Sequence, residues 1–70
     1  MWDKTVEKSI RFWQKEKECV IVLSQMGAAT IMDVLFMDGH IEKGIHLGSR
    51  QASGDYICVQ MSRYFKRAAQ

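Results

Sequence analysis

The chain has 70 residues, a length that allows one small domain whose single apolar core is barely sufficient for stability. Hydrophobic residues make up 47% of the sequence and charged residues 26%, with no proline, and this composition excludes global disorder. No apolar run approaches the ~20 residues of a membrane span, and the first residues lack the basic start and apolar middle of a signal peptide. We therefore expect a compact cytoplasmic domain without a membrane partner.

The net charge of +2 is unevenly distributed along the chain. Residues 1–42 carry five Lys or Arg against seven Asp or Glu, a balance of −2, whereas residues 43–70 carry five against one, a balance of +4. A basic second half favours a polyanionic partner, which can be a nucleic acid or an acidic protein surface.

An amphipathic helix is predicted at the start of the chain, because large apolar side chains recur at spacings of four, four and three. These side chains are Trp2, Val6, Ile10 and Trp13. Asp3 is a residue type that caps helix starts, since its carboxylate can accept a hydrogen bond from a free backbone N–H. We interpret the two tryptophans as core or subunit-contact residues, because a small domain needs bulky side chains for burial.

Two segments in the middle of the chain allow alternative assignments. Cys19 to Leu23 contains three consecutive β-branched residues and favours a strand, although a helical continuation of the preceding segment stays open. Apolar residues recur at helical spacing after Gly27, and this pattern predicts a short central helix from about Ala28 to Met37, ended by Gly39. Its apolar residues are too many for one narrow stripe, so the helix is buried on two sides or the segment is a strand.

A β-hairpin is predicted next, with strands at Ile41 to Leu47 and Tyr56 to Met61. The loop between them, Gly48 to Gly54, is longer than a minimal hairpin turn, and its only long side chains are Arg50 and Gln51. A long loop that holds an arginine in solvent is typical of a contact element.

A short C-terminal helix, capped by Ser62, is predicted to follow the hairpin. Its inward stripe consists of Met61, Tyr64, Phe65 and Ala68, and its outward face carries Arg63, Lys66 and Arg67. The three cations can contact phosphates, or they can complement the negative end of the helix dipole.

The run from Leu23 to Met61 resembles the second half of a winged helix-turn-helix DNA-binding domain. The similar segments are LSQMG, AATIMDVLFMDG, HIEKG, the Gly-bounded loop and DYICVQM. The resemblance implies an α+β fold in which the hairpin forms the wing of a small, non-enzymatic DNA-binding regulatory protein. The segment between Gly27 and Gly39 is too short for both usual helices, so one of them is missing or merged.

Duplex DNA is the expected partner, bound mainly by the wing and the C-terminal helix. The segment from Ala28 to Met37 offers only Thr30 and Asp33 to bases, so backbone contacts should dominate and affinity should be largely independent of sequence. The expected contact residues are Lys43, Ser49, Arg50, Gln51, Arg63, Lys66 and Arg67.

Two further hypotheses stay open. Four strands after the first helix, at residues 19–23, 31–36, 41–47 and 56–61, would form a small SH3-like β-barrel that resembles the Sm-like RNA-binding proteins. Alternatively, the chain is a protein-binding module, such as a small inhibitor or adaptor of the kind that phages and other mobile elements encode, with its basic half on an acidic protein surface.

No catalytic, cofactor or metal site is expected. His40, Glu42 and His46 alternate onto one face of the predicted strand, which we interpret as a solvated face rather than a metal site. Cys19 and Cys58 lack the spacing of a zinc or redox motif and should be reduced and buried. The small size, two tryptophans and five methionines favour a homodimer, through the first helix or the segment from residue 31 to 37.

Overall fold

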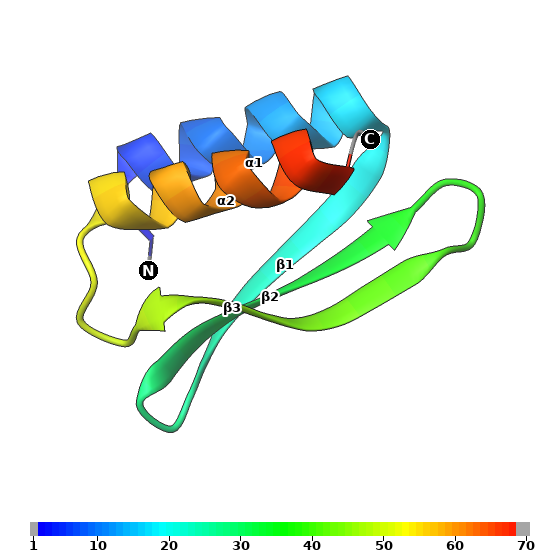
Figure 1. Ribbon diagram of the computed structural model, residues 1–70. Coiled ribbons are helices and arrows are strands. Elements are labelled where there is room, and N and C mark those ends of the chain that lie inside the picture. Colours follow the sequence, from blue (N-terminus) through cyan, green and yellow to red (C-terminus); the bar gives the residue numbers. More distant parts are fainter. Residues whose placement is uncertain (1, 69–70) are drawn as a thin grey trace.

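Figure 1 shows the computed structural model, which describes residues 2–68 as two helices lying over a three-stranded antiparallel sheet. The elements in chain order are α1 (Lys4–Lys17), β1 (Cys19–Met26), β2 (Ala29–Phe36), β3 (Ile41–Ser49) and α2 (Gly54–Ala68). The strand order in the sheet is β1-β2-β3. Both helices cover the same face of the sheet, and the opposite face is open. The α+β class, a helix at each end and antiparallel pairing between them are confirmed.

Helix α1 begins and ends at local sequence signals. The Asp3 carboxylate accepts a hydrogen bond from the N–H of Val6 over 2.9 Å, which caps the first turn. At the other end Glu18 adopts a left-handed conformation with φ 52°, and its N–H donates to the carbonyl of Gln14. Val6 and Trp13 are buried, as the apolar spacing predicts.

The predicted central helix from Ala28 to Met37 is wrong, because residues 29–36 form the central strand β2. Thr30, Met32 and Val34 are buried at 1% exposure or less, and the residues between them lie on the open face. Ile31 and Leu35 are apolar although they lie on the open face, so the strand lacks a clear alternation and its sequence can imitate helical spacing. The strand predicted at residues 19–23 is confirmed and continues to Met26.

The predicted strand from Tyr56 to Met61 is also wrong, since these residues belong to α2. Ser53 caps this helix: its Oγ accepts a hydrogen bond from the N–H of Tyr56 over 3.2 Å, and its carbonyl accepts one from the N–H of Ile57 over 3.1 Å. The β-branched and aromatic residues here are poor evidence for a strand, because packing of one helical face overrides propensity.

The hairpin of residues 41–47 and 56–61 therefore does not form, and neither does the fourth strand of the alternative barrel. The C-terminal helix starts at Gly54 rather than at Ser62. Its buried stripe contains Ile57, Met61 and Phe65, which recur every four residues. Ala68 ends the helix, and its side chain lies outside the part of the chain that the structure describes.

The two helices run parallel and pack along their whole length. The rings of Trp13 and Phe65 stack with centroids 5.1 Å apart and planes 14° from parallel. One turn earlier the Ser9 hydroxyl lies 3.7 Å from the sulfur of Met61, and earlier still the Cys58 thiol lies 3.5 Å from the Thr5 carbonyl. These polar contacts join residues 52 and 53 positions apart, so the helices stay in constant register.

Candidate nucleic-acid interface

The side chain of Arg50 is exposed but folds back onto the turn between β1 and β2. Its Nε donates to the carbonyl of Gly27 over 2.9 Å, and its Nη1 donates to Oε1 of Gln25 over 2.8 Å. Its Nη2 lies 3.3 Å from the carbonyl oxygen of Gln25. Three of its five guanidinium N–H groups are thus used inside the molecule.

The loop around Arg50 connects the sheet to α2 and is shorter than the sequence indicates. Strand β3 runs to Ser49, so only residues 50–53 remain between β3 and α2. Ser49 is exposed, and its carbonyl accepts a hydrogen bond from the buried Thr30 hydroxyl over 3.0 Å. Gln51 is exposed in the turn that follows. This loop holds the end of the sheet together.

Lys43 lies apart from the other expected contact residues. It sits on β3 between Glu42, which pairs with the buried Val34, and Gly44, whose left-handed φ of 73° marks a bulge. Strand alternation therefore places Lys43 on the open face of the sheet, opposite the helices.

The other three expected residues lie together on α2. Arg63, Lys66 and Arg67 are exposed, on the side of the helix away from Ile57 and Met61. The sequence therefore places these cations correctly on an outward helical face, although the helix is longer than predicted.

Helix α1 adds a second row of cations that the sequence interpretation missed. Lys4, Lys8, Arg11 and Lys15 recur at spacings of four, three and four, and all four are exposed. This spacing puts them on one side of the helix, opposite the buried Val6. We call the exposed cations of both helices the basic helical face, which consists of Lys4, Lys8, Arg11, Lys15, Arg63, Lys66 and Arg67.

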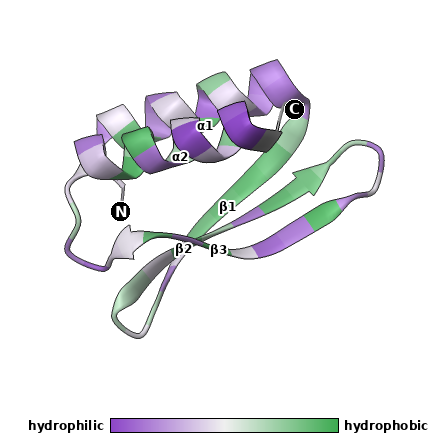
Figure 2. Cartoon of the chain, in the orientation of Figure 1, coloured by the Kyte–Doolittle hydropathy of each residue, from purple (hydrophilic) through white to green (hydrophobic). Residues whose placement is uncertain are grey.

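Positive charge is concentrated in the helical layer. The two helices carry eight Lys or Arg against Glu7, Glu16 and Asp55, a balance of +5, and the rest of the chain carries two against five, a balance of −3. In Figure 2, hydrophilic residues recur along both helices, whereas β1 is hydrophobic over most of its length. Positive charge is therefore concentrated in the helical layer of the fold, and not only in residues 43–70.

A shallow hollow interrupts the basic helical face on α2. It is lined by Cys58, Val59, Ser62, Arg63 and Lys66. Val59 is 50% exposed, and Phe12 on the neighbouring helix is 54% exposed. The surface therefore combines cations with apolar groups that can pack against a base or an apolar side chain.

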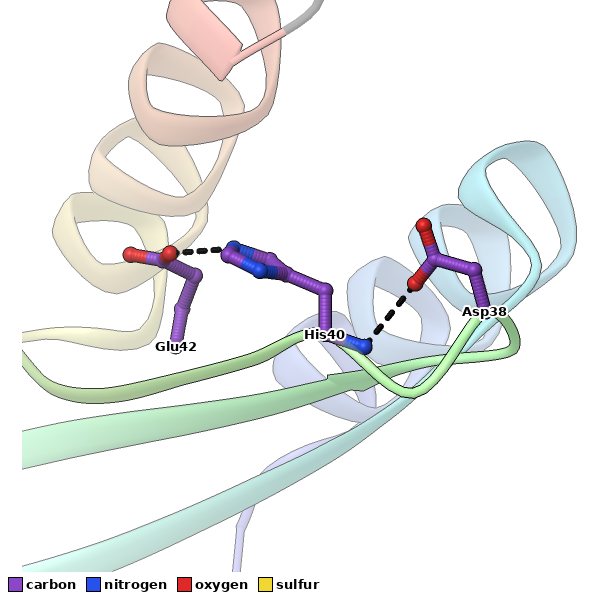
Figure 3. A network of polar contacts seen from close by, with 3 residues as sticks. All are labelled: Asp38, His40 and Glu42. Atoms are coloured by element: carbon purple, nitrogen blue, oxygen red, sulfur yellow. Dashed lines mark hydrogen bonds and ion pairs between the residues drawn. The ribbon is translucent and has the colours of Figure 1, made fainter.

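The turn between β2 and β3 holds a small polar network, shown in Figure 3. The N–H of His40 donates to Oδ1 of Asp38 over 2.9 Å, and the His40 ring pairs with the Glu42 carboxylate. His46 lies on the opposite face of the sheet from Glu42, because it pairs with Ile31 while Glu42 pairs with Val34. The single face predicted for these three residues is wrong, since the Gly44 bulge reverses the alternation.

Both cysteines are free thiols, and burial raises the pKa of each. For Cys58, a hydrogen bond with Ser9 opposes this increase in pKa, and the nearby negative charges of Asp3 and Asp55 add to it. Burial also raises the pKa of Tyr64, with a further increase from the Glu42 charge. A thiol of raised pKa is mostly protonated at neutral pH, so it contains little of the reactive thiolate.

Residues 2–68 contain no group of three His, Cys, Asp or Glu side chains arranged to hold a metal ion. Within the same range, neither helix has the length and hydrophobicity needed to cross a bilayer. Comparison with known proteins finds no matching family model, no matching curated protein and no matching solved structure.

Proposed function

We propose that this protein is a non-enzymatic nucleic-acid-binding protein that contacts the phosphate backbone with its basic helical face. The observation that carries the proposal is the placement of seven exposed cations on the outer sides of two parallel, adjacent helices. Lysine and arginine side chains on an exposed face supply the charge neutralisation that dominates affinity for nucleic acids.

The dimensions of this face suit a duplex. Lys4 and Lys15 are separated by eleven helical steps, about 16 Å at 1.5 Å per residue, which spans about five base pairs of B-form DNA. The second helix adds a parallel row about 8–10 Å away, the usual distance between packed helices. Two cationic rows at this spacing can contact phosphates without reading bases, so affinity should depend weakly on sequence.

Arg50 has no part in the proposed interface. Its guanidinium holds the turn between β1 and β2, and Lys43 lies on the opposite side of the sheet from the helices. The contact surface that we propose thus keeps Arg63, Lys66 and Arg67 from the sequence prediction and replaces the wing with helix α1.

An acidic protein surface is a second candidate partner for the same face. The observation that favours it is the exposure of Phe12 on α1 and of Val59, which lines the hollow on α2 together with Arg63 and Lys66. Aromatic and apolar groups surrounded by arginine and lysine are typical of protein contact surfaces.

The experiment is a titration of a fluorescent 20-base-pair duplex at 50 and 200 mM salt. The test variant Lys8→Ala/Arg63→Ala removes one cation from each helix, and the matched control Lys17→Ala/Lys43→Ala removes two cations outside the basic helical face. We expect the test pair to weaken binding at least tenfold at 50 mM salt and to lower the slope of log affinity against log salt by about 2. We expect the control pair to weaken binding less than threefold.

Equal losses in the two pairs would overturn the proposed location of the interface. Two results together would favour the second candidate partner over nucleic acid. The wild type would bind no duplex at 50 mM salt, and it would capture an acidic protein that Lys8→Ala/Arg63→Ala does not capture.

A further inference from the structure

The open face of the sheet carries an apolar row that crosses all three strands. Val20 pairs with Leu35, and Leu35 pairs with Ile41, so the three side chains lie next to one another on this face. Their exposed fractions are 50%, 42% and 53%. Covering these half-exposed aliphatic side chains would remove apolar surface from water, which is energetically favourable.

Further apolar residues extend this row along β1. Val22 and Met26 lie on the same face as Val20 by strand alternation, and they are 49% and 65% exposed. Five aliphatic side chains of this exposure present several hundred Å² of apolar surface, the size at which a patch marks an interaction site. This is of the order of the ~800 Å² that each partner contributes to a specific interface.

The formal charges on the open face cancel. Asp33 and Lys43 are its charged residues among the described strands, and Oδ1 of Asp33 accepts a hydrogen bond from the N–H of Gly44 over 3.0 Å. Two copies of a face with no net charge can approach each other, whereas two basic helical faces repel. The charge pattern thus favours a second copy of this chain on the open face.

Both edges of the sheet are protected against pairing with another strand. On β1 the N–H of Ile21 donates to Oε1 of Gln14 over 2.8 Å, and Trp2 lines a hollow beside Leu23 and Ser24. On β3 the register shifts twice, and such bulges twist an edge out of the flat geometry that strand addition needs. A second copy should therefore stack face to face rather than extend the sheet.

From these four observations we propose that the protein forms a two-fold homodimer through the open faces of its sheets. The result is a four-layer particle, helices outside and two sheets packed about 10 Å apart inside. The two basic helical faces then point in opposite directions. If they bind nucleic acid, which is the function proposed above, one dimer can hold two duplexes.

Sedimentation equilibrium at 100 µM tests the dimer. We expect the wild type to have twice the 8.1 kDa chain mass, and Leu35→Lys to have the single-chain mass with an unchanged far-UV circular dichroism spectrum. Val59→Lys is the matched control, since it places the same charge at a half-exposed aliphatic residue on the helical side, and it should stay dimeric. A monomeric wild type, or a Leu35→Lys dimer, would overturn the proposal.

A second measurement does not depend on a variant. When ¹⁵N-labelled wild-type protein is diluted, amide shifts should change at Val20, Val22 and Leu35 and stay constant along the outer sides of the helices. Changes confined to α1 or α2 would place the interface on the helices and reject the sheet face.

A duplex-bridging experiment tests the dimer and the proposed nucleic-acid function separately. A mixture of biotinylated and fluorescent duplexes should be co-captured on streptavidin by the wild type, and at least tenfold less by Leu35→Lys, which still binds each duplex. If the wild type is dimeric but binds no duplex, the proposed function fails while the dimer stands. If Leu35→Lys is monomeric and still bridges duplexes, the bivalent arrangement is wrong.

Discussion

Arg50 and Gln25 exchange two hydrogen bonds across the end of the sheet, one from the Arg50 guanidinium and one to the Arg50 backbone carbonyl. Nη1 of Arg50 donates to Oε1 of Gln25 over 2.8 Å, and Nε2 of Gln25 donates to the carbonyl of Arg50 over 3.1 Å. The sequence predicts that the loop holds Arg50 in solvent as a contact residue. In the structure, Arg50 is instead a clamp between β1 and the segment that leads into α2.

The clamp predicts that Arg50 substitutions affect stability and leave duplex affinity unchanged. Arg50→Ala should lower the free energy of unfolding by about 1 kcal/mol, since exposed hydrogen bonds contribute modestly. Arg50→Lys should cost about as much, because lysine keeps the charge but cannot reach three acceptors at once. Urea unfolding and duplex titration of both variants check this. A tenfold loss of affinity in Arg50→Ala that Arg50→Lys restores would return Arg50 to the interface.

The starts of the two helices are predicted to be coupled through Asp3 and Gly54. A Cβ at Gly54 would overlap the carboxylate of Asp3, so Gly54→Ala should displace this cap of α1 and lower the free energy of unfolding by about 1 kcal/mol. Asp3→Ala alone should cost about 1 kcal/mol through loss of the cap. Adding Gly54→Ala to Asp3→Ala should then cost little further stability. Additive free energies in this urea-unfolding cycle would contradict the coupling.

The stacked pair Trp13 and Phe65 is predicted to dominate the contact between the helices. Phe65→Leu should lower the free energy of unfolding by about 1–3 kcal/mol, because it removes buried contact area and the ring stacking. Phe12→Leu makes the same chemical change at a ring that is 54% exposed and should stay within about 0.5 kcal/mol of the wild type. Urea unfolding measures both variants. Equal decreases in the free energy of unfolding would show that the stacked pair does not dominate the contact between the helices.

Stability is predicted to fall at alkaline pH. Burial raises the pKa of Cys19, Cys58 and Tyr64 above their ordinary values of 9.0 for the thiols and 10.0 for the phenol. As the pH rises through that range, these groups lose protons in the unfolded chain before they do so in the folded chain, and the free energy of unfolding decreases. Urea midpoints should be constant from pH 7 to 8 and decline above about pH 9. Cys19→Ala/Cys58→Ala should show a smaller decline than the wild type.

The sequence predicts α1 correctly because two independent signals agree there: the apolar spacing and the Asp cap. It fails at β2 because apolar residues lie on both faces of this strand: Met32 and Val34 face the core, and Ile31 and Leu35 lie on the open face. It fails at the start of α2 because Tyr56, Ile57 and Val59 have high β propensity. The Ser53 cap and the four-residue spacing from Ile57 to Phe65 would have indicated the helix.

The α2 part of the candidate site is predicted from the sequence, and the α1 part is missed. The row on α2 follows from its own helical periodicity, and the row on α1 has an equally clear periodicity in Lys4, Lys8, Arg11 and Lys15. Counting charge over residues 1–42 conceals that row, because the acidic residues Asp33, Asp38 and Glu42 lie on the sheet and its turn. Only the fold shows that the two rows lie side by side.

The most direct test of the basic helical face is to map a bound duplex on ¹⁵N-labelled protein at 50 mM salt. We predict amide shift changes along the outer sides of α1 and α2, strongest near Lys8, Arg11, Arg63 and Lys66, with no change at Val22 or Leu35 on the sheet. Shift changes centred on the open sheet face or on the β2–β3 turn, with the helices unaffected, would contradict this prediction.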